Sequence, residues 1–233
     1  AKTKNPINNK TSPIHLNDIN IPLKYRIRTT DKEKNSSSIF LLHGFGSHMD
    51  DLFSLNQFFP PEWTIVSLQA PISTGFGGWA WAQIDFSNIR TILNLEEGST
   101  SKDMVLLSVN ECVNTLGLNP DGVHLIGFSQ GATLAIYCGL SNPNTFRGVA
   151  SICGLIEDQH LEDDLKKNEI KTLNTFVSNC TMDDKIPIEF GRATESKLKN
   201  LGLNVEYKEY DSGHGVSNDC LNDLLNWIKS IKK

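Results

Sequence analysis

Residues 123–140 read VHLIGFSQGATLAIYCGL, and this stretch decides the fold. Residues 123–127 form a largely apolar run, which is typical of a strand buried on both faces. Residues 130–140 have the apolar spacing of a helix. Ser129 lies between the two elements, at the centre of a G-x-S-x-G motif. A strand, a tight turn and a helix in this order predict a nucleophile elbow, the turn that lifts a serine hydroxyl above the edge of a sheet.

The two glycines of the motif, Gly127 and Gly131, fit this prediction because the turn is sharp. A side chain at either position would collide with neighbouring elements while Ser129 is held toward a substrate. The helix that begins after Ser129 points its N-terminal amides and the positive end of its dipole at the same place. We therefore expect the backbone N–H of Gln130 to be one donor of an oxyanion hole.

Outward from this stretch, strands and helices alternate along most of the chain. The first predicted strand, 21–29, alternates apolar and polar residues and is expected to be an antiparallel edge strand. The alternation predicts the α/β class, with a mostly parallel sheet, helices on both faces and a ligand site beyond the carboxyl ends of the strands. The other strands are predicted over 38–43, 64–68, 149–153, 173–178 and 205–210, and the other helices over 51–59, 102–116, 188–201 and 217–231.

The length of 233 residues suits a single domain with a sizeable core. Residues 1–20 are polar and rich in Lys and Asn, so we expect a flexible N-terminal arm followed by one domain over 21–233. The stretch 70–98 contains several glycines and two tryptophans and has weak periodicity. We expect it to be a long loop that shapes the site.

The charge balance limits which classes of ligand are expected. There are 27 acidic and 22 basic residues, a formal net charge of -5, which does not favour binding to nucleic acid or to an anionic membrane. No apolar run is long enough to span a bilayer, so no integral membrane association is expected. A small-molecule or lipid-like substrate is expected, bound by a monomer or a homodimer. The sequence starts at Ala1 and leaves open whether a leader was removed before it.

The five cysteines are widely spaced and contain no C-x-x-C pair, a pattern that predicts neither a zinc site nor a disulfide framework. Cys112, Cys138 and Cys153 lie in apolar stretches, where a free thiol behaves as a small buried hydrophobe. Reduced thiols favour a cytoplasmic location.

A serine hydroxyl needs a general base, and after a nucleophile elbow the acid and then the histidine follow in chain order. Two histidines follow Ser129. His160 lies in a polar segment, 157–168, that is expected to be a solvated helix or loop. His214 directly follows the last strand, and the glycines on both sides suggest a chain bent to present one side chain. His214 is therefore the predicted base.

The acid is expected in the loop that follows the strand 173–178. Asp183 and Asp184 are adjacent there, ahead of Pro187. One of them is predicted to orient the histidine, and the other to be a solvated turn residue or a helix N-cap. Periodicity and spacing do not choose between them.

A second glycine-bearing loop, His43-Gly44-Phe45-Gly46, ends an early strand. Loops of this kind supply the second oxyanion donor in such enzymes, and the amide of Phe45 is our candidate. His43 precedes the serine in the chain and is therefore expected to be structural.

Taken together, these residues resemble the carboxylesterase/phospholipase family of α/β hydrolases, which includes acyl-protein thioesterases and small bacterial carboxylesterases. The resemblance covers most of the chain, and the ordered set of motifs is far more specific than any one of them. The matching segments are Leu42-His43-Gly44-Phe45-Gly46, Asp51-Leu52, Gln69-Ala70-Pro71, Ala80-Trp81, Gly127-Phe128-Ser129-Gln130-Gly131, Asp183 with Ile186-Pro187, and Gly213-His214.

The resemblance implies the α/β-hydrolase fold and cleavage of carboxylic esters or thioesters without a metal or organic cofactor; lysophospholipids are a further candidate substrate. In the family the acid stands four residues before the proline, which selects Asp183 over Asp184. The family's oxyanion amides correspond to Phe45 and Gln130. The sequence departs from the family pattern twice, at Asn179-Cys180 and at Ala82, and the second departure is expected to widen the acyl pocket.

The sequence therefore predicts a carboxylic ester hydrolase with a Ser129–Asp183–His214 triad that works through an acyl-enzyme. Phe76, Trp79 and Trp81 are expected to line the substrate pocket. A peptidase or a dienelactone-type hydrolase on the same fold is an alternative. A catalytically silent binding protein with this fold is another alternative, against which the intact triad argues.

Overall fold

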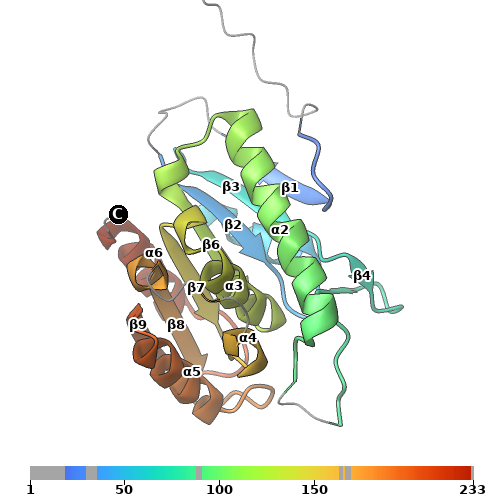
Figure 1. Ribbon diagram of the computed structural model, residues 1–233, viewed down its shortest axis with the longest axis vertical. Coiled ribbons are helices and arrows are strands. Elements are labelled where there is room, and N and C mark those ends of the chain that lie inside the picture. The colour runs from blue at the N-terminus through green and yellow to red at the C-terminus, as the bar shows by residue number, and fades with distance from the viewer. Residues whose placement is uncertain (1–18, 30–35, 88–90, 163–164, 166–168, 232–233) are drawn as a thin grey trace, which may run out of the picture.

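β6 (Val123–Phe128) lies in the middle of a seven-stranded sheet in the part of the chain that the structure describes (Figure 1). The structure is a computed structural model that describes residues 19–29, 36–87, 91–162, 165 and 169–231. The strand order is β1-β3-β2-β6-β7-β8-β9. The other strands of this sheet are β1 (Tyr25–Arg28), β2 (Ser38–Leu42), β3 (Thr64–Leu68), β7 (Gly148–Ile152), β8 (Asn174–Cys180) and β9 (Asn204–Tyr210).

β1 pairs antiparallel with β3 at one edge, and every other pair in this sheet is parallel. The predicted α/β class, the mostly parallel sheet and the antiparallel first strand are thus confirmed. Parallel strands place all their carboxyl ends along one edge, which is where such sheets bind ligands. Ser129 directly follows β6 at this edge.

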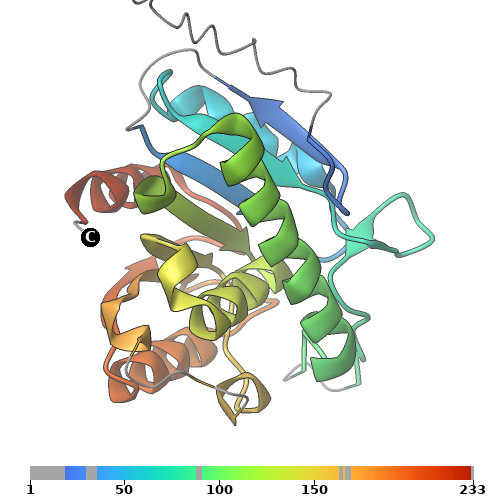
Figure 2. The same ribbon diagram turned by 45° about the horizontal axis from the view of Figure 1, so that its top comes forward.

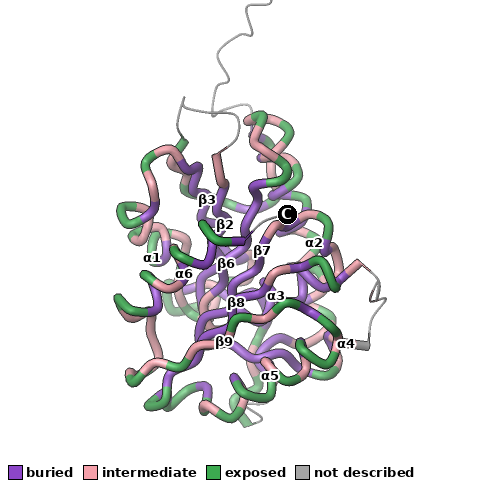
Figure 3. The backbone as a smooth tube through the Cα atoms, turned by 90° about the vertical axis from the view of Figure 1, so that its left-hand side faces the viewer, coloured by how far each residue is buried: buried purple, intermediate pink, exposed green. Residues whose placement is uncertain are grey.

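Two hydrophobic clusters lie on the two faces of the sheet, whose strands form the buried centre in Figure 3. One cluster includes Cys138 of α3 and Leu198 of α5, and the other includes Leu52 of α1 and Trp227 of α6. Helices therefore cover both faces, as predicted. The helices are α1 (Met49–Phe53), α2 (Leu95–Leu116), α3 (Gln130–Ser141), α4 (Gln159–Glu162), α5 (Ile188–Asn200) and α6 (Asn218–Ser230).

The packed part of the chain begins before the predicted boundary at residue 21. Ile19 is buried in the cluster that packs against α3. Residues 1–18 lie outside the described residues, so the predicted arm over 1–20 stays a prediction. No helix among the described residues has the length and the apolar character that a membrane span needs.

Two predicted helix boundaries were wrong. The helix predicted over 51–59 is a short α1 followed by a 3₁₀ helix, Ser54–Phe58. The guanidinium of Arg28 donates to the carbonyl oxygens of Asn56 and Pro60. In a continuous α-helix these carbonyl groups would instead point along the helix axis. The helix predicted over 102–116 begins at Leu95, because the side chain of Asn94 caps it by accepting from the Glu97 amide at 3.0 Å.

The stretch 70–98, predicted to be a long loop, contains the start of α2 and a small two-stranded hairpin. The hairpin pairs β4 (Ile72–Ser73) with β5 (Trp79–Ala80) and projects beside the N-terminal half of α2 (Figures 1 and 2). Its backbone is tied to the loop after β2: the Gly46 amide donates to the Trp79 carbonyl at 2.9 Å, and the Trp79 amide donates to the Ser47 carbonyl at 2.8 Å.

All five cysteines are free and buried, as expected for the three in apolar stretches.

The surroundings of His160 differ from the prediction. It lies in α4 and is fully buried, with its ring 4.8 Å from that of Tyr137 and Nε2 3.0 Å from the carbonyl oxygen of Leu93. Its segment is therefore not solvated at this position, and the ring packs into the core instead of reaching Ser129.

His124 of β6 is also fully buried, beside Trp227 and Ile231, and neither ring nitrogen has a hydrogen-bond partner among the described residues. Burial, assisted by the nearby Arg147, lowers its pKa from 6.5 to about 3. The unfolded chain therefore binds a proton below pH 6.5 that the folded chain does not. The stability that neutral His124 contributes is present above pH 6.5 and is lost as the pH falls.

We expect the free energy of unfolding to fall by about 2 kcal/mol more between pH 7 and pH 5 in the wild type than in His124→Gln, which cannot titrate there. Urea unfolding at the two pH values measures the difference. Equal pH dependence in wild type and His124→Gln would contradict this account.

Candidate active site

Ser129 has a backbone conformation that non-glycine residues rarely adopt, with φ 55° and ψ −117°. Its amide donates to the carbonyl oxygen of Ile152 at 2.9 Å, which fixes the turn against β7. A Cβ atom at Gly127 would overlap the carbonyl oxygen of Gly131, and one at Gly131 would overlap that of Leu42. Both glycines are therefore required sterically, and the strained turn is the predicted elbow.

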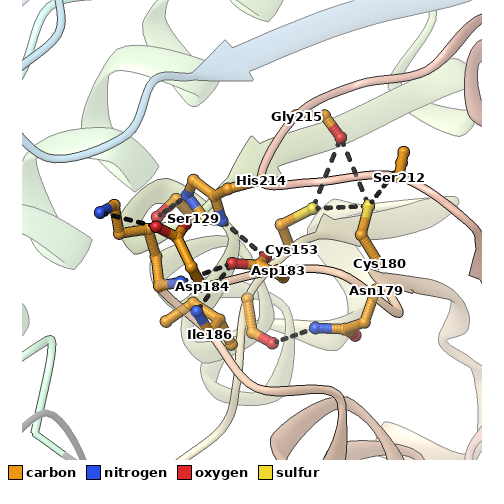
Figure 4. Close-up of polar contacts among 12 residues, drawn as sticks. Ser129, Cys153, Asn179, Cys180, Asp183, Asp184, Ile186, Ser212, His214 and Gly215 are labelled. Carbon is orange, nitrogen blue, oxygen red and sulfur yellow. Dashed lines mark hydrogen bonds and ion pairs between the residues drawn. The ribbon is translucent and has the colours of Figure 1, made fainter.

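Ser129, His214 and Asp183 form a continuous hydrogen-bonded chain (Figure 4). Nε2 of His214 lies 3.0 Å from Oγ of Ser129, and Nδ1 lies 2.6 Å from Oδ2 of Asp183. Because a carboxylate only accepts hydrogen bonds, Nδ1 carries the ring proton and Nε2 is free to accept from the serine hydroxyl. This tautomer is the one that a general base for Ser129 needs.

The structure also separates the two neighbouring aspartates. The side chain of Asp183 is fully buried, and its Oδ1 accepts from the amides of Lys185 and Ile186 at 2.8 and 2.9 Å. Asp184 is exposed and contacts Lys185 Nζ at 3.2 Å. Asp183 thus meets His214, and Asp184 lies on the surface.

The loops that carry Asp183 and His214 are joined to each other. The Met182 amide donates to the Ser212 carbonyl at 3.1 Å, and Thr181 Oγ1 donates to Asp211 at 2.8 Å. These loops follow β8 and β9, which pair in parallel up to Cys180 and Tyr210. The register of two neighbouring strands therefore sets the distance between the two side chains.

The glycines that flank His214 are not required in the way that the sequence suggests. Neither Gly213 nor Gly215 has a positive φ, and a Cβ atom at either would meet no atom closer than 3.9 Å. The ring of His214 is instead positioned by its hydrogen bonds and by the ring of Phe128, whose centroid lies 4.9 Å away.

The amides of Phe45 and Gln130, the predicted oxyanion donors, have no acceptor in the described part of the chain. Gln130 is the first residue of α3, and Phe45 lies in the loop that the hairpin holds through Gly46. A Cβ atom at Gly44 would lie 3.3 Å from Cβ of Ser129, so this loop runs directly beside the serine. Donors at a helix N-terminus and on such a loop suit a developing oxyanion.

The side chain of Gln130 has a role that sequence reasoning missed. It is buried, accepts from the Trp81 amide at 2.9 Å, and donates to the carbonyl oxygens of Ala82 and Ile92 at 2.7 Å each. The buried Glu157 accepts from the amide of Ile92 at 2.7 Å, and burial raises the pKa of its carboxyl. These bonds attach the chain between the hairpin and α2 to the first residue after Ser129.

His43 is buried and structural, as expected. Nε2 accepts from the Ala70 amide at 3.0 Å, and Nδ1 lies 2.8 Å from the Gly44 carbonyl oxygen, to which it donates. Burial lowers the pKa of His43 to about 4, so the ring is neutral at pH 7. The neutral ring fixes the loop that carries Phe45.

Phe76 and Trp81 do not fit the predicted pocket lining, because one is almost fully exposed and the other fully buried. Phe76 is 98% exposed near the tip of the hairpin, and Trp81 is fully buried, with its indole N–H donating to the His43 carbonyl at 2.8 Å. Trp79 is half-buried, with Lys24 Nζ over its ring. Ala82 is also fully buried in the core. An aromatic residue beside the site that was missed is Phe86, whose ring meets that of Phe45 edge-on at 5.6 Å.

The chain matches the model of the phospholipase/carboxylesterase family over residues 26–232. It is 26% identical over 86% of its length to a probable carboxylesterase of Oryza sativa subsp. japonica, covering 79% of that protein. It is 24% identical over 85% of its length to acyl-protein thioesterase 1 of Aspergillus fumigatus, covering 89% of that protein. The crystal structure of esterase PE8 superposes with a TM-score of 0.77 at 25% identity, over 90% of this chain and 99% of that one.

The fold and these matches show that the protein is an α/β hydrolase. Within that class, it belongs to the phospholipase/carboxylesterase family, a family of carboxylic ester hydrolases.

The elbow geometry predicts a sharp difference between two glycines. Gly131→Ala should lower the free energy of unfolding by about 3 kcal/mol or more, because the added methyl group overlaps the backbone of the loop after β2. Gly213→Ala is the matched control, since its nearest atom would lie 3.9 Å away, and it should change stability little. Urea unfolding of both variants measures this. Wild-type stability in Gly131→Ala would show that the elbow tolerates a side chain.

Proposed function

We propose that Ser129, His214 and Asp183 form a catalytic triad that hydrolyses carboxylic esters through an acyl-enzyme. His214 takes the proton of Ser129 as the serine oxygen attacks the ester carbonyl, and Asp183 holds the ring and stabilises the imidazolium. The amides of Phe45 and Gln130 hold the oxyanion. His214 then protonates the leaving alcohol, and water, deprotonated by the same ring, hydrolyses the acyl-enzyme.

The observation that carries this proposal is the unbroken relay from Ser129 Oγ through both ring nitrogens to a buried carboxylate. A binding protein with a silent version of this fold has no need to keep a buried aspartate and a strained serine on the two sides of one histidine, an arrangement that costs free energy of folding. The elbow, the relay and the two unpaired amides together favour an enzyme over that alternative.

The surroundings of Ser129 favour an uncharged acyl or alcohol group. The rings of Phe45 and Phe86 meet beside the loop of the oxyanion hole, and that of Phe128 lies against His214. Apolar surfaces of this kind bind hydrocarbon chains. We propose a small-molecule or lipid-like ester as the substrate class, with thioesters and lysophospholipids as the members to test, and the cytoplasm, in keeping with five free thiols, as the location.

Ser129→Ala should retain the fold and lose turnover by about 10⁴-fold or more, because the oxyanion hole and binding alone remain. The measurement is kcat/KM on p-nitrophenyl esters of increasing chain length, beside acyl-CoA thioesters and a lysophospholipid. A fluorophosphonate probe should label Ser129 in the wild type and leave the variant unlabelled. An unlabelled, inactive wild type would instead favour the silent binding protein, and activity on peptides or dienelactones alone would favour the other hydrolases.

The two aspartates give a matched pair. Asp183→Asn should lower kcat by about 10⁴-fold, because an amide favours the wrong tautomer of His214, as the same change does in a serine protease triad. Asp184→Asn, on the exposed neighbour, should leave kcat within a few-fold. Both variants are checked by circular dichroism and assayed on one soluble short-chain ester. A collapse of the rate in Asp184→Asn alone would move the acid by one position.

A further inference from the structure

Two thiols lie side by side behind the loop that carries His214 (Figure 4). The Sγ atoms of Cys153 and Cys180 are 3.5 Å apart, and both residues are buried and free of disulfides. Cys153 directly follows β7 and Cys180 ends β8, and these two strands pair in parallel. The sheet itself therefore brings both sulfur atoms to the edge at which the proposed triad is built.

Other donor atoms converge on the same place. Sγ of Cys153, a carboxylate oxygen of Asp183 and a ring nitrogen of His214 all lie within 4.8 Å of one another. The carbonyl oxygen of Gly215 lies 3.5 Å from Cys153 Sγ and 3.7 Å from Cys180 Sγ. Thiolate, imidazole and carboxylate are the ligands that Zn²⁺ takes, and softer thiophilic ions such as Cd²⁺ favour the same thiolates.

The spacing of the two sulfur atoms suits a shared metal ion. Two thiolates on one tetrahedral zinc ion, at Zn–S distances of about 2.3 Å, stand about 3.8 Å apart. The observed separation of Cys153 and Cys180 is 3.5 Å. An ion between them leaves the two sulfur atoms almost in place, whereas His214 and Asp183 exchange their mutual hydrogen bond for bonds to the ion.

Metal binding, unlike formation of a disulfide, leaves the oxidation state of the two sulfur atoms unchanged. A thiophilic ion displaces the thiol protons as it binds and needs no oxidant.

We propose that Cys153, Asp183 and His214, with Cys180 as a fourth ligand, form an inhibitory site for a thiophilic divalent metal ion of the Zn²⁺ and Cd²⁺ class. On binding, the thiol protons of Cys153 and Cys180 pass to solvent. The ion binds the side chains of His214 and Asp183, so His214 no longer accepts the proton of Ser129. The site is distinct from a cofactor site, because its occupation blocks the proposed reaction and supplies no step of it.

The ion reaches this site past His214. The side chain of His214 is 18% exposed, whereas that of Asp183 is fully buried, as is Cys153. A turn of that one ring away from Ser129 opens the way to the sulfur atoms. The inference rests on the proposed function only for its inhibitory effect, since ion binding is measured without turnover.

The test is a titration of the full chain with Cd²⁺, after treatment with EDTA and with reductant removed under nitrogen. Sulfur-to-cadmium charge-transfer absorption in the near ultraviolet should saturate at about one ion per chain, because only cysteine thiolates give this band. Cys153→Ala and Cys180→Ala should each reduce the band to about half or less, since only one of the two thiolates remains in each variant. Cys112→Ala, at a buried thiol on the other face of the sheet, is the matched control and should keep it. If Cys153→Ala does not fold, Cys153→Ser replaces it.

The same samples are assayed for hydrolysis of p-nitrophenyl acetate. Cd²⁺ should inhibit the wild type and Cys112→Ala, EDTA should restore both, and Cys153→Ala should resist inhibition. Ser129→Ala should bind Cd²⁺ as the wild type does, so that failure of the proposed function and failure of the metal site are told apart. The absence of a charge-transfer band in the wild type, or a full band in the Cys153 variant, would overturn the proposal.

Discussion

The close approach of backbone to backbone at Gly127 and Gly131 is the constraint on which the site depends. Without Cβ atoms at these positions, α3 starts directly against the end of β6, and Ser129 is forced to the positive φ that lifts its hydroxyl out of the sheet. The same contact places the loop after β2 beside the serine. One steric condition therefore positions Ser129, the proposed nucleophile, and the two amides proposed for the oxyanion hole, and the strain is sustained by the buried strands around it.

Buried polar bonds carry this positioning outward to the long excursion between β3 and α2. Gln130 binds backbone groups at three points, Trp81, Ala82 and Ile92, and Glu157 holds the last of these from the opposite side. Each bond gives a hydrogen-bond partner to a backbone group that is buried away from water. Losing the Gln130 side chain would leave a carbonyl or amide unpaired at every one of these points, so this side chain couples the excursion to the elbow.

The elements that periodicity and steric rules determine could be predicted from the sequence, and those that depend on distant partners could not. The strand 64–68 and the helix after Ser129 follow from apolar patterns, and His214 from chain order. The choice between Asp183 and Asp184 needed the family resemblance, because two amide donors after β8 decide it. The burial of His160 and the early end of α1 depend on Tyr137 and Arg28, which lie far away in the sequence. Exposure of Phe76 follows from a hairpin that is too short to show a pattern.

The departure at Asn179-Cys180 shows how the acid loop accommodates residues that differ from the family pattern. The buried side-chain amide of Asn179 donates to the Gly154 carbonyl at 3.1 Å. Its other side faces α5, where a Cβ atom on Gly191 would overlap it, so these two positions constrain each other. Asn179 thereby ties β8 to the chain after β7 just ahead of the loop that carries Asp183. The loop of Asp183 is therefore held from two directions: Asn179 ties the end of β8 to Gly154, and the amides of Lys185 and Ile186 hold the carboxylate itself.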